Sequence, residues 1–301
     1  MKYDIVILTD SRYEKPKKTD WYIDQVLLED SLVQKSLEAK GLNVIRKDWA
    51  CPNFNWESTQ YAIFRTTWDY FDRFEEFFTW FEKTKKIVQF INIPEIIYWN
   101  LDKHYLQDLE KMGLNIPPTH YIEKGEQQSL QNLFEKTKWQ KAILKPAIAG
   151  AARETFLIDI NDFKKFEGDF QRLITKEAML FQEFQHQIQS KGEMSLMMIG
   201  GKYTHAVLKK AKSGDFRVQD DFGGTVETYR ANQDEIAFAK IAIAACPQLP
   251  VYARVDIFHD NNNQLALGEL ELIEPELWFR NYPKAAKNFA LSVIEFISKM
   301  N

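Results

Sequence analysis

The stretch that decides the fold lies at residues 253–275 and reads ARVDIFHDNNNQLALGELELIEP. Two apolar runs flank the asparagines at residues 261–263, and this pattern predicts a β-hairpin. Asp256 belongs to the first run, and Glu269 and Glu271 lie on one face of the second because side chains alternate along a strand. Three carboxylates that converge in this way repel one another unless cations neutralise them. Hard oxygen ligands of this kind suit Mg2+ held together with nucleotide phosphates.

The same acids are also compatible with a solvated strand at the edge of a sheet. Aliphatic residues separate the acids between Leu267 and Ile273, and they make the run too apolar for a freely exposed edge. The metal site is therefore the favoured interpretation. The pattern leaves open whether Glu271 or Glu274 completes it.

A second stretch, AILKPAIAGAARETFLI at residues 142–158, places Lys145 and a string of small residues between two apolar runs. Burying a lysine is costly unless an anion meets it, and a loop of small residues lets the backbone approach a ligand closely. The stretch therefore indicates an anion site, for example for phosphate. The competing interpretation is an exposed hairpin with its lysine at a strand end.

The first hundred residues alternate short β-type runs with helical patterns, which predicts an α/β layer with a parallel sheet. Phenylalanines recur at helical spacing between Phe71 and Phe81, so we expect a buried helix face and not a stacking platform. No GxGxxG follows the first strand, which argues against a nicotinamide oxidoreductase. The rest of the chain reads as α+β, with a hairpin around Gly200 and Gly201 and a helix at the C-terminus.

Composition limits the partners. The 301 residues carry a net charge of −4 with acids and bases interspersed, so no basic surface for nucleic acid is expected. The first apolar run is too short for a signal peptide, and no run approaches membrane-spanning length. We expect a cytoplasmic protein without a membrane partner. The sequence does not decide between a monomer and a homodimer.

Seven motifs in order carry a family resemblance. They are WNLDK at residue 99, LKPAIAGAA at 144, FQEF at 181, GEMSL at 192, GDFRVQDDFGG at 214, ARVD at 253 and ELELIEP at 269. Together they resemble the ATP-grasp superfamily, in the branch similar to prokaryotic glutathione synthetase and the ribosomal-protein glutamate ligases. RTTWDY at residues 65–70 is similar to the cycloserine-forming ligase and its relatives, which close or join small amino-acid-derived substrates.

The resemblance implies an ATP-grasp fold of α/β and α+β units. Residues 1–100 would form an N-terminal, Rossmann-like pre-ATP-grasp domain. Residues 101–185 would form the central lid subdomain, and residues 186–301 the C-terminal subdomain with the metal site. ATP would lie between the two α+β subdomains.

The resemblance also implies the nucleotide contacts. Lys103 and Lys145 match the two phosphate-binding lysines, and the loop around Gly150 would act as a lid whose amides face the phosphates. Family loops are usually richer in Gly or Ser, and alanine does not adopt positive φ cheaply. Arg153 would either replace a missing amide contact or face solvent. The adenine side would be formed by Gln182, Glu183 and Phe184.

Further roles follow from the same motif matches. Glu193 stands where an acid accepts the ribose hydroxyls, with an exposed acid at a strand start as the alternative. Arg217 matches the arginine that steadies the transferred phosphoryl group, and Lys209 is a further catalytic candidate. Gln219 stands where relatives often have Asn. Arg254 requires a buried anion, either a phosphate or substrate carboxylate, or a salt bridge to Asp256 or Glu271.

Substrate contacts are expected in two places. In RTTWDY, Arg65 would bind the carboxylate of an amino-acid substrate and Asp69 its ammonium group, with Trp68 and Tyr70 beside them. The competing interpretation assigns Trp68 and Tyr70 to core packing and Arg65 to a surface ion pair. Gly223 and Gly224 would admit close backbone contact with the acyl group.

The predicted activity is that of a carboxylate–amine ligase that uses ATP and Mg2+, with Mn2+ as an alternative metal. An acyl phosphate would form first, and an amine would displace phosphate to give an amide or peptide bond, within one molecule or between two. The partner would be a small amino-acid or peptide substrate. The alternative is a catalytically inactive ATP-binding protein with a regulatory or scaffolding role.

Overall fold

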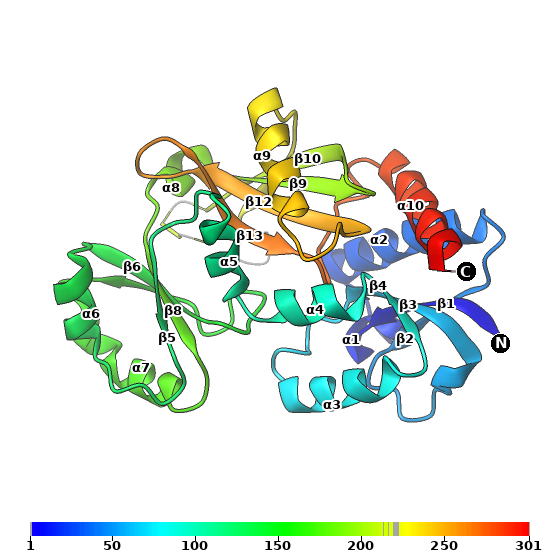
Figure 1. Ribbon diagram of the computed structural model, residues 1–301, viewed down its shortest axis with the longest axis horizontal. Coiled ribbons are helices and arrows are strands. Elements are labelled where there is room, and N and C mark those ends of the chain that lie inside the picture. The colour runs from blue at the N-terminus through cyan, green and yellow to red at the C-terminus, as the bar shows by residue number, and fades with distance from the viewer. Residues whose placement is uncertain (1, 213, 216, 219–222, 301) are drawn as a thin grey trace.

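The computed structural model describes residues 2–212, 214–215, 217–218 and 223–300. Within these residues the strands form three sheets, which follow one another along the longest axis of the molecule (Figure 1). No helix in this part of the chain combines the length and apolar character needed to span a membrane.

The first sheet has the order β2-β1-β3-β4, and all of its strands are parallel. Its strands are β1 (Tyr3–Thr9), β2 (Val44–Asp48), β3 (Thr59–Thr66) and β4 (Gln89–Ile91). Its helices are α1 (Ser11–Glu14), α2 (Trp21–Glu38), η1 (Trp56–Ser58), α3 (Phe74–Thr84) and α4 (Pro94–Leu101). The predicted parallel layer is confirmed. The pattern missed β2 because this edge strand is half-buried and rich in charged residues.

The phenylalanine face of α3 is only partly as expected. Phe77 and Phe81 are fully buried against the first sheet, whereas Phe78 is 38% exposed. Phe71 precedes the helix and does not belong to its face. The helical spacing therefore identified the two residues on the inner side of the helix, and was wrong for Phe71 and Phe78.

The second sheet is antiparallel, with the order β5-β8-β6-β7. Its strands are β5 (Thr119–Ile122), β6 (Lys141–Pro146), β7 (Phe156–Asp159) and β8 (Met179–Glu183). The helices α6 (Leu130–Thr137) and α7 (Glu167–Ile174), with η2 (Phe163–Lys165), cover one side of it and share its hydrophobic core (Figure 1). On the other side, Leu180 of β8 packs into the core of the third sheet, while Ile143, Lys145 and Gln182 line a cavity.

The third sheet has the order β11-β10-β9-β12-β13 and is also antiparallel. Its strands are β9 (Glu193–Ile199), β10 (Lys202–Lys210), β11 (Thr225–Tyr229), β12 (Tyr252–His259) and β13 (Leu265–Glu271). Gly200 and Gly201 take positive φ at the β9–β10 turn, as the predicted hairpin requires. The helices beside this sheet are α5 (Tyr105–Lys111), α8 (Gln187–Lys191) and α9 (Gln233–Ala244).

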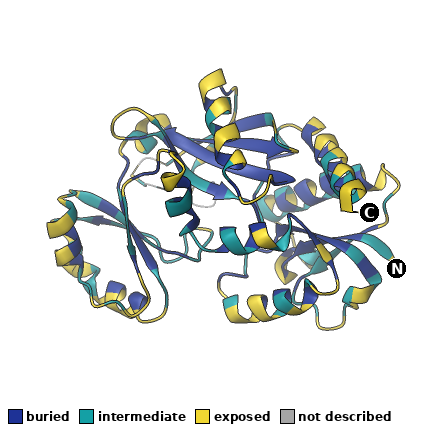
Figure 2. Ribbon diagram, in the orientation of Figure 1, coloured by how far each residue is buried: buried dark blue, intermediate teal, exposed yellow. Residues whose placement is uncertain are grey.

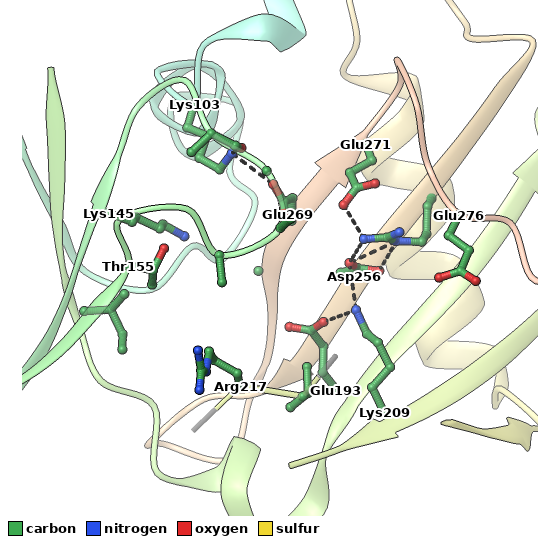
Figure 3. A pocket seen from close by; sticks show the side chains of 18 of the residues that line it. Lys103, Lys145, Thr155, Glu193, Lys209, Arg217, Asp256, Glu269, Glu271 and Glu276 are labelled. Atoms are coloured by element: carbon green, nitrogen blue, oxygen red, sulfur yellow. Dashed lines mark hydrogen bonds and ion pairs between the residues drawn. The ribbon is translucent and has the colours of Figure 1, made fainter. Parts of the chain in front are cut away.

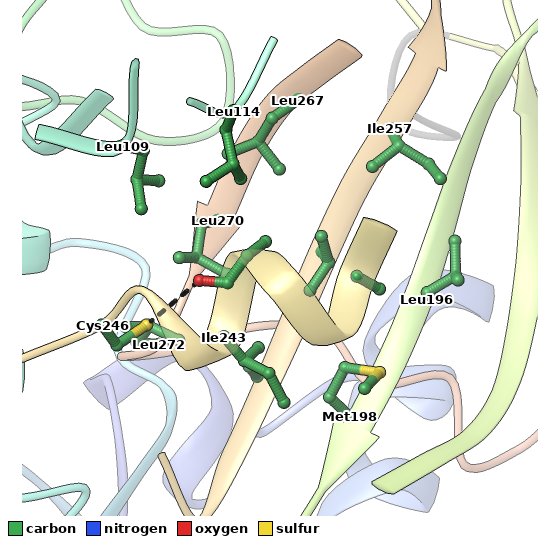
Figure 4. Close-up of a cluster of buried hydrophobic side chains, with 14 of the residues drawn as sticks. Leu109, Leu114, Leu196, Met198, Ile243, Cys246, Ile257, Leu267, Leu270 and Leu272 are labelled. Atoms are coloured by element: carbon green, nitrogen blue, oxygen red, sulfur yellow. Dashed lines mark hydrogen bonds between the residues drawn. The ribbon is translucent and has the colours of Figure 1, made fainter. Parts of the chain in front are cut away.

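Two cores hold the third sheet. On one face, aliphatic residues of β9, β12 and β13 pack against α5 and α9, with Leu196, Ile243 and Leu270 fully covered (Figure 4). On the other face, strands β9, β10 and β12 share a core with β1, β3 and α2. The C-terminal helix α10 (Lys284–Met300) belongs to this shared core and packs against α2. Figure 2 shows buried residues along the strands of the third sheet and exposed residues on the outer turns of the helices. The division at residues 100 and 185 stays a prediction.

Two buried asparagines join the segment between the first and second sheets to the third. Asn92 Nδ2 donates to the carbonyls of Tyr252 (2.9 Å) and Leu272 (2.8 Å), and its Oδ1 accepts from the Val251 amide (2.6 Å). Asn100 donates to the Leu270 carbonyl and accepts from the Leu272 amide. Both side chains therefore satisfy backbone groups at the ends of β12 and β13, which would otherwise be buried without partners.

Replacing Asn92 by alanine should destabilise the fold strongly. The change leaves three buried backbone groups without a hydrogen-bond partner, and each costs about 1–3 kcal/mol. We therefore expect the free energy of unfolding, measured in urea, to fall by at least about 3 kcal/mol. The control is Asn132→Ala, at an exposed position on α6. Equal stability of the two variants would contradict the role given to Asn92.

Candidate active site

A cavity of about 350 Å3 lies between the second and third sheets and reaches the first. Its lining comes from strands of the second and third sheets, from α1, α2 and α8, and from loops that include those after β3, β6 and β13. Figure 3 shows Lys103 and Lys145 on one side of the cavity and the acidic residues of the third sheet on the other. The described site is therefore assembled from segments far apart in the sequence.

The three carboxylates predicted to converge do so. The β12–β13 register sets Asp256 opposite Glu269 and Arg254 opposite Glu271. One oxygen from each of Asp256, Glu269 and Glu271 lies within 4.8 Å of the others. β13 is an edge strand, but its acids line the cavity and are not a solvated edge.

Arg254 and Lys209 are the cations that hold Asp256, and Arg254 also pairs with Glu271. Arg254 contacts Asp256 through Nε (3.0 Å) and Nη2 (2.8 Å) and also pairs with Glu271. Lys209 Nζ lies 3.1 Å from Asp256 Oδ2 and also pairs with Glu193. The salt-bridge interpretation of Arg254 is therefore the one observed. Glu193 faces the cavity beside Lys209, so the exposed-acid alternative is wrong.

The pKa shifts show which acid lacks a full counter-charge. Burial alone would raise the pKa of Asp256, but Arg254 and Lys209 bring it below its ordinary value. Burial raises the pKa of Glu271 well above its ordinary value, and Arg254 opposes this only in part. Negative charge at Glu271 is thus under-compensated. The three oxygen donors therefore fit a hard divalent cation such as Mg2+.

The two predicted phosphate lysines differ in their partners. Lys103 Nζ lies 3.1 Å from Glu269 Oε1 and donates to the Ala149 carbonyl at 2.5 Å. Lys145 is the last residue but one of β6 and lines the cavity, and no carboxylate of the described residues lies within 4.0 Å of its Nζ. Burial lowers the pKa of Lys145, while Glu269 partly opposes the shift. Lys145 is not an exposed hairpin residue, and its environment suits an incoming anion.

The small-residue loop reaches its shape without glycine at the strained positions. Ala151, Ala152 and Glu154 all have positive φ, whereas Gly150 does not. A Cβ on Gly150 would lie 2.6 Å from a ring carbon of Phe71, so this glycine is needed for close packing. Arg153 is not a solvent-facing residue, because it pairs with Glu177 and donates to the Ile148 carbonyl at 2.9 Å.

The predicted adenine residues lie together at the end of β8. Gln182, Glu183 and Phe184 all line the cavity. The amide of Phe184 donates to the Lys141 carbonyl at 3.1 Å, and its carbonyl accepts from Asn261 Nδ2 at 3.0 Å. These backbone groups of Phe184 are already engaged. A ligand here relies more on the Glu183 carbonyl, which among the described residues accepts a side-chain bond from Gln185 at 3.1 Å.

The segment around the predicted phosphoryl-binding arginine is only partly described. Arg217 lines the cavity and pairs with Asp215 at 2.8 Å. Gln219 lies outside the described residues, so its role stays a prediction. Gly223 and Gly224 are described but do not line the cavity, and a contact between them and the acyl group has no geometric support.

The RTTWDY segment requires the largest correction. Trp68 lines the cavity, but Arg65, Asp69 and Tyr70 do not. Arg65 is 1% exposed and donates to the Pro275 carbonyl at 2.9 Å, because a buried guanidinium needs internal acceptors. Asp69 accepts from Trp49 Nε1 and pairs with Arg73, each at 2.7 Å. Tyr70 is buried, with a hydrogen bond to Glu274.

Sequence reasoning missed part of the cavity. Its further polar lining residues are Arg12, Tyr13, Tyr22, Thr155, Gln185 and Glu276, together with Glu274, which was considered only as a metal ligand. Arg12 and Tyr13 follow the carboxyl end of a parallel strand, where α/β folds place ligands, and this position was an available signal. Glu274 and Thr155 lie in stretches already quoted, whereas Tyr22, Gln185 and Glu276 belong to no motif and are brought to the cavity by the fold.

Comparisons with known proteins agree with this geometry. Residues 102–272 match the model of the RimK-like ATP-grasp domain, and residues 5–92 match that of the N-terminal domain of D-cycloserine synthetase DcsG. Cycloserine biosynthesis protein DcsG of Streptomyces lavendulae is 24% identical over 268 residues, covering 82% of this chain and 87% of the relative.

Solved structures share the fold. The crystal structure of D-cycloserine synthetase DcsG aligns with a TM-score of 0.85 at 22% identity, covering 97% of this chain and 98% of that one. A D-alanine–D-alanine ligase from Bacillus anthracis complexed with ATP aligns with a TM-score of 0.66 at 11% identity, covering 97% and 96%.

The fold and the cavity define an enzyme of the ATP-grasp class, a ligase that forms carbon–nitrogen bonds. Because the matching domain model spans more than half of its residues, the chain belongs to the RimK-like ATP-grasp family. The resemblance drawn from the seven motifs is thereby confirmed.

Removing Arg254 should cost far more stability than removing the charge of Glu271. Arg254→Gln leaves Asp256 and Glu271 without their shared cation, and breaking such a buried pair costs about 3–5 kcal/mol. Glu271→Gln removes an acid whose ionisation burial disfavours, so unfolding in urea without Mg2+ should change little. A loss below about 1 kcal/mol in Arg254→Gln would argue against the network.

Glu274 should make stability depend on pH in a defined direction. Burial raises its pKa from 4.5 to about 7, although the hydrogen bond from Tyr70 opposes the shift. The folded state therefore binds this proton more tightly than the unfolded state, and the stabilisation is complete below 4.5 and disappears as pH rises through about 7. Glu274→Gln lacks this component, so its stability relative to the wild type should rise over that window in urea titrations. A difference independent of pH would contradict the assignment.

Proposed function

We propose that this chain is a carboxylate–amine ligase that uses ATP and Mg2+ to activate a small substrate carboxylate and join it to an amine. One observation carries the proposal: two lysines and three converging carboxylates face each other across one cavity between two sheets. Opposed charges of this kind suit a polyphosphate held with divalent cations. The family supports the same chemistry.

The phosphates are placed at the lysine side of the cavity. Lys145 has no described carboxylate within ion-pair distance, and its burial favours an anionic ligand. Lys103 is held by Glu269 and the Ala149 carbonyl, so it ties the small-residue loop to the carboxylates. This loop would lie over the phosphates, with its positive-φ residues turning amides inward as in other anion-binding loops.

The nucleoside is placed at the end of β8. Gln182, Glu183 and Phe184 form that wall, and the Glu183 carbonyl keeps a lone pair for the adenine amino group. Glu193 would accept the ribose hydroxyls, with Lys209 holding its carboxylate in place. ATP would therefore extend from β8 toward the acids of β12 and β13.

The chemistry requires positioning and charge neutralisation more than acid–base catalysis. Asp256, Glu269 and Glu271 would hold Mg2+, which neutralises phosphate charge when bound. Arg217 would steady the transferred phosphoryl group from the other side of the cavity. Arg254 acts indirectly, since its contacts with Asp256 and Glu271 fix the metal-binding oxygens.

The substrate is proposed to be a small amino-acid derivative or short peptide. The support is the likeness to D-cycloserine synthetase and D-alanine–D-alanine ligase, together with the space beyond the carboxylates, which Trp68 and the residues of α1 and α2 line. Ring closure within one molecule and joining of two molecules remain alternative outcomes of the same activation. Release of ADP and phosphate from Mg-ATP with pooled amino acids, followed by mass spectrometry of the products, tests this proposal. Nucleotide binding without substrate-stimulated release would instead favour the inactive ATP-binding protein.

Lys145→Ala should weaken ATP binding without unfolding the protein. The loss of one charged contact to phosphate corresponds to about 1.5–3 kcal/mol, or roughly 10- to 100-fold in the dissociation constant, and turnover should fall in parallel. Lys141→Ala is the matched control, since Lys141 lies on the same strand but pairs with Asp159 away from the cavity. Wild-type ATP affinity in Lys145→Ala would reject the phosphate role.

A further inference from the structure

The loop that follows β13 brings an acidic residue to the cavity in a fixed position. Three successive carbonyls of this loop accept side-chain donors. Tyr252 Oη donates to Ile273 O (2.8 Å), Trp68 Nε1 to Glu274 O (3.0 Å) and Arg65 Nη1 to Pro275 O (2.9 Å). The backbone on both sides of Glu274 is therefore held by residues of the first and third sheets.

The Glu274 carboxylate lacks a cationic partner in the described part of the chain. The carboxylate interacts with the Tyr70 hydroxyl, and Lys103 lowers its pKa from a longer distance while pairing with Glu269. No ion pair joins Glu274 to a lysine or arginine of the described residues. The neighbouring Glu276 differs, because it pairs with Arg280. Both acids line the cavity, but only Glu276 is already neutralised in this way. A cation arriving in the cavity would thus gain more from Glu274.

Aromatic rings line the cavity at the same end. Trp68 packs edge-on against Tyr13 at 5.7 Å between ring centroids, and Tyr22 lies 6.5 Å from Trp68. Ring faces attract ammonium and similar cations, most strongly when water is excluded. The Arg12 guanidinium already lies over the Tyr13 ring, 5.2 Å from its centroid. Glu274, Trp68 and Tyr22 therefore form the part of the lining suited to a compact organic cation.

We propose that Glu274, with the rings of Trp68 and Tyr22, binds a primary ammonium group of the substrate. The inference rests on the proposed function. It assigns ammonium binding to Glu274 and not to Asp69, because the Asp69 carboxylate is engaged with Trp49 and Arg73. Arg65 then acts as a positioning residue, because it holds the carbonyl next to Glu274 and touches no ligand. Burial raises the pKa of the Glu274 carboxyl to about 7, and a cation bound beside it would lower that pKa.

The test measures binding of matched probes without turnover. The ammonium probes are D-alanine, L-alanine, D-serine and L-serine, and their desamino counterparts are propionate and 3-hydroxypropionate. Saturation-transfer NMR is recorded on the full chain with Mg2+ and a non-hydrolysable ATP analogue, whose own binding is measured first. We expect at least one ammonium probe to bind at least about tenfold more tightly than its counterpart, which corresponds to about 1.4 kcal/mol.

Variants locate the effect. Glu274→Gln should weaken the preferred ammonium probe about tenfold and abolish its advantage over the desamino probe, with nucleotide affinity unchanged. Glu227→Gln is the control, since Glu227 pairs with Lys210 on an exposed strand outside the cavity. Thermal unfolding verifies that each variant is folded, and the wild-type probe comparison does not depend on any variant.

The outcomes separate this inference from the proposed function. Equal binding of ammonium and desamino probes, no ammonium binding at millimolar concentration, or full retention of the preference in Glu274→Gln would each overturn the ammonium site. A preserved preference in a protein that binds the analogue but never releases ADP would uphold the site and reject the ligase activity. A larger loss in Glu276→Gln than in Glu274→Gln would also overturn the assignment.

Discussion

The buried charges on β12 and β13 are the constraint on which the rest of the structure depends. Asp256, Glu269 and Glu271 meet on one face of the third sheet, and acids this close are tolerated only with cations among them. Arg254 supplies one from β12 and Lys209 another from β10. Any slip of register by one residue would turn these side chains to the opposite face, so the pairing of β9, β10, β12 and β13 is tightly specified.

The first sheet contributes to the cavity mainly by fixing the backbone of neighbouring segments of the third sheet. The first sheet shares one hydrophobic core with β9, β10, β12 and α10, so the first and third sheets pack directly against each other. Across this contact Arg65 and Trp68 fix the loop after β13, while Asn92 and Asn100 fix the ends of its strands. The RTTWDY segment therefore looks like a ligand-binding motif in sequence but contributes mostly as a clamp on a neighbouring loop.

The small-residue loop adopts its shape although residues other than glycine occupy its positive-φ positions. Positive φ falls on Ala151, Ala152 and Glu154, where alanine and glutamate are strained relative to glycine. Gly150 is instead required because Phe71 leaves no room for a Cβ. Two further contacts hold the loop: Lys103 donates to the carbonyl of Ala149 in the loop, and Arg153 of the loop pairs with Glu177. These contacts offset the strain and hold the loop over the cavity.

The sequence by itself determined the parallel first sheet, the hairpin of β12 and β13, and the convergence of Asp256, Glu269 and Glu271, because alternation and helical spacing are local properties. The ordered motifs also identified the ATP-grasp class. Only the tertiary structure decided that Arg65 and Asp69 turn inward, that Arg254 holds the acids, and that Tyr13, Tyr22 and Glu274 share one end of the cavity. The reason is physical: whether a polar side chain faces a ligand or satisfies a buried partner depends on how the elements pack around it, and for Arg65 the partner is the distant Pro275.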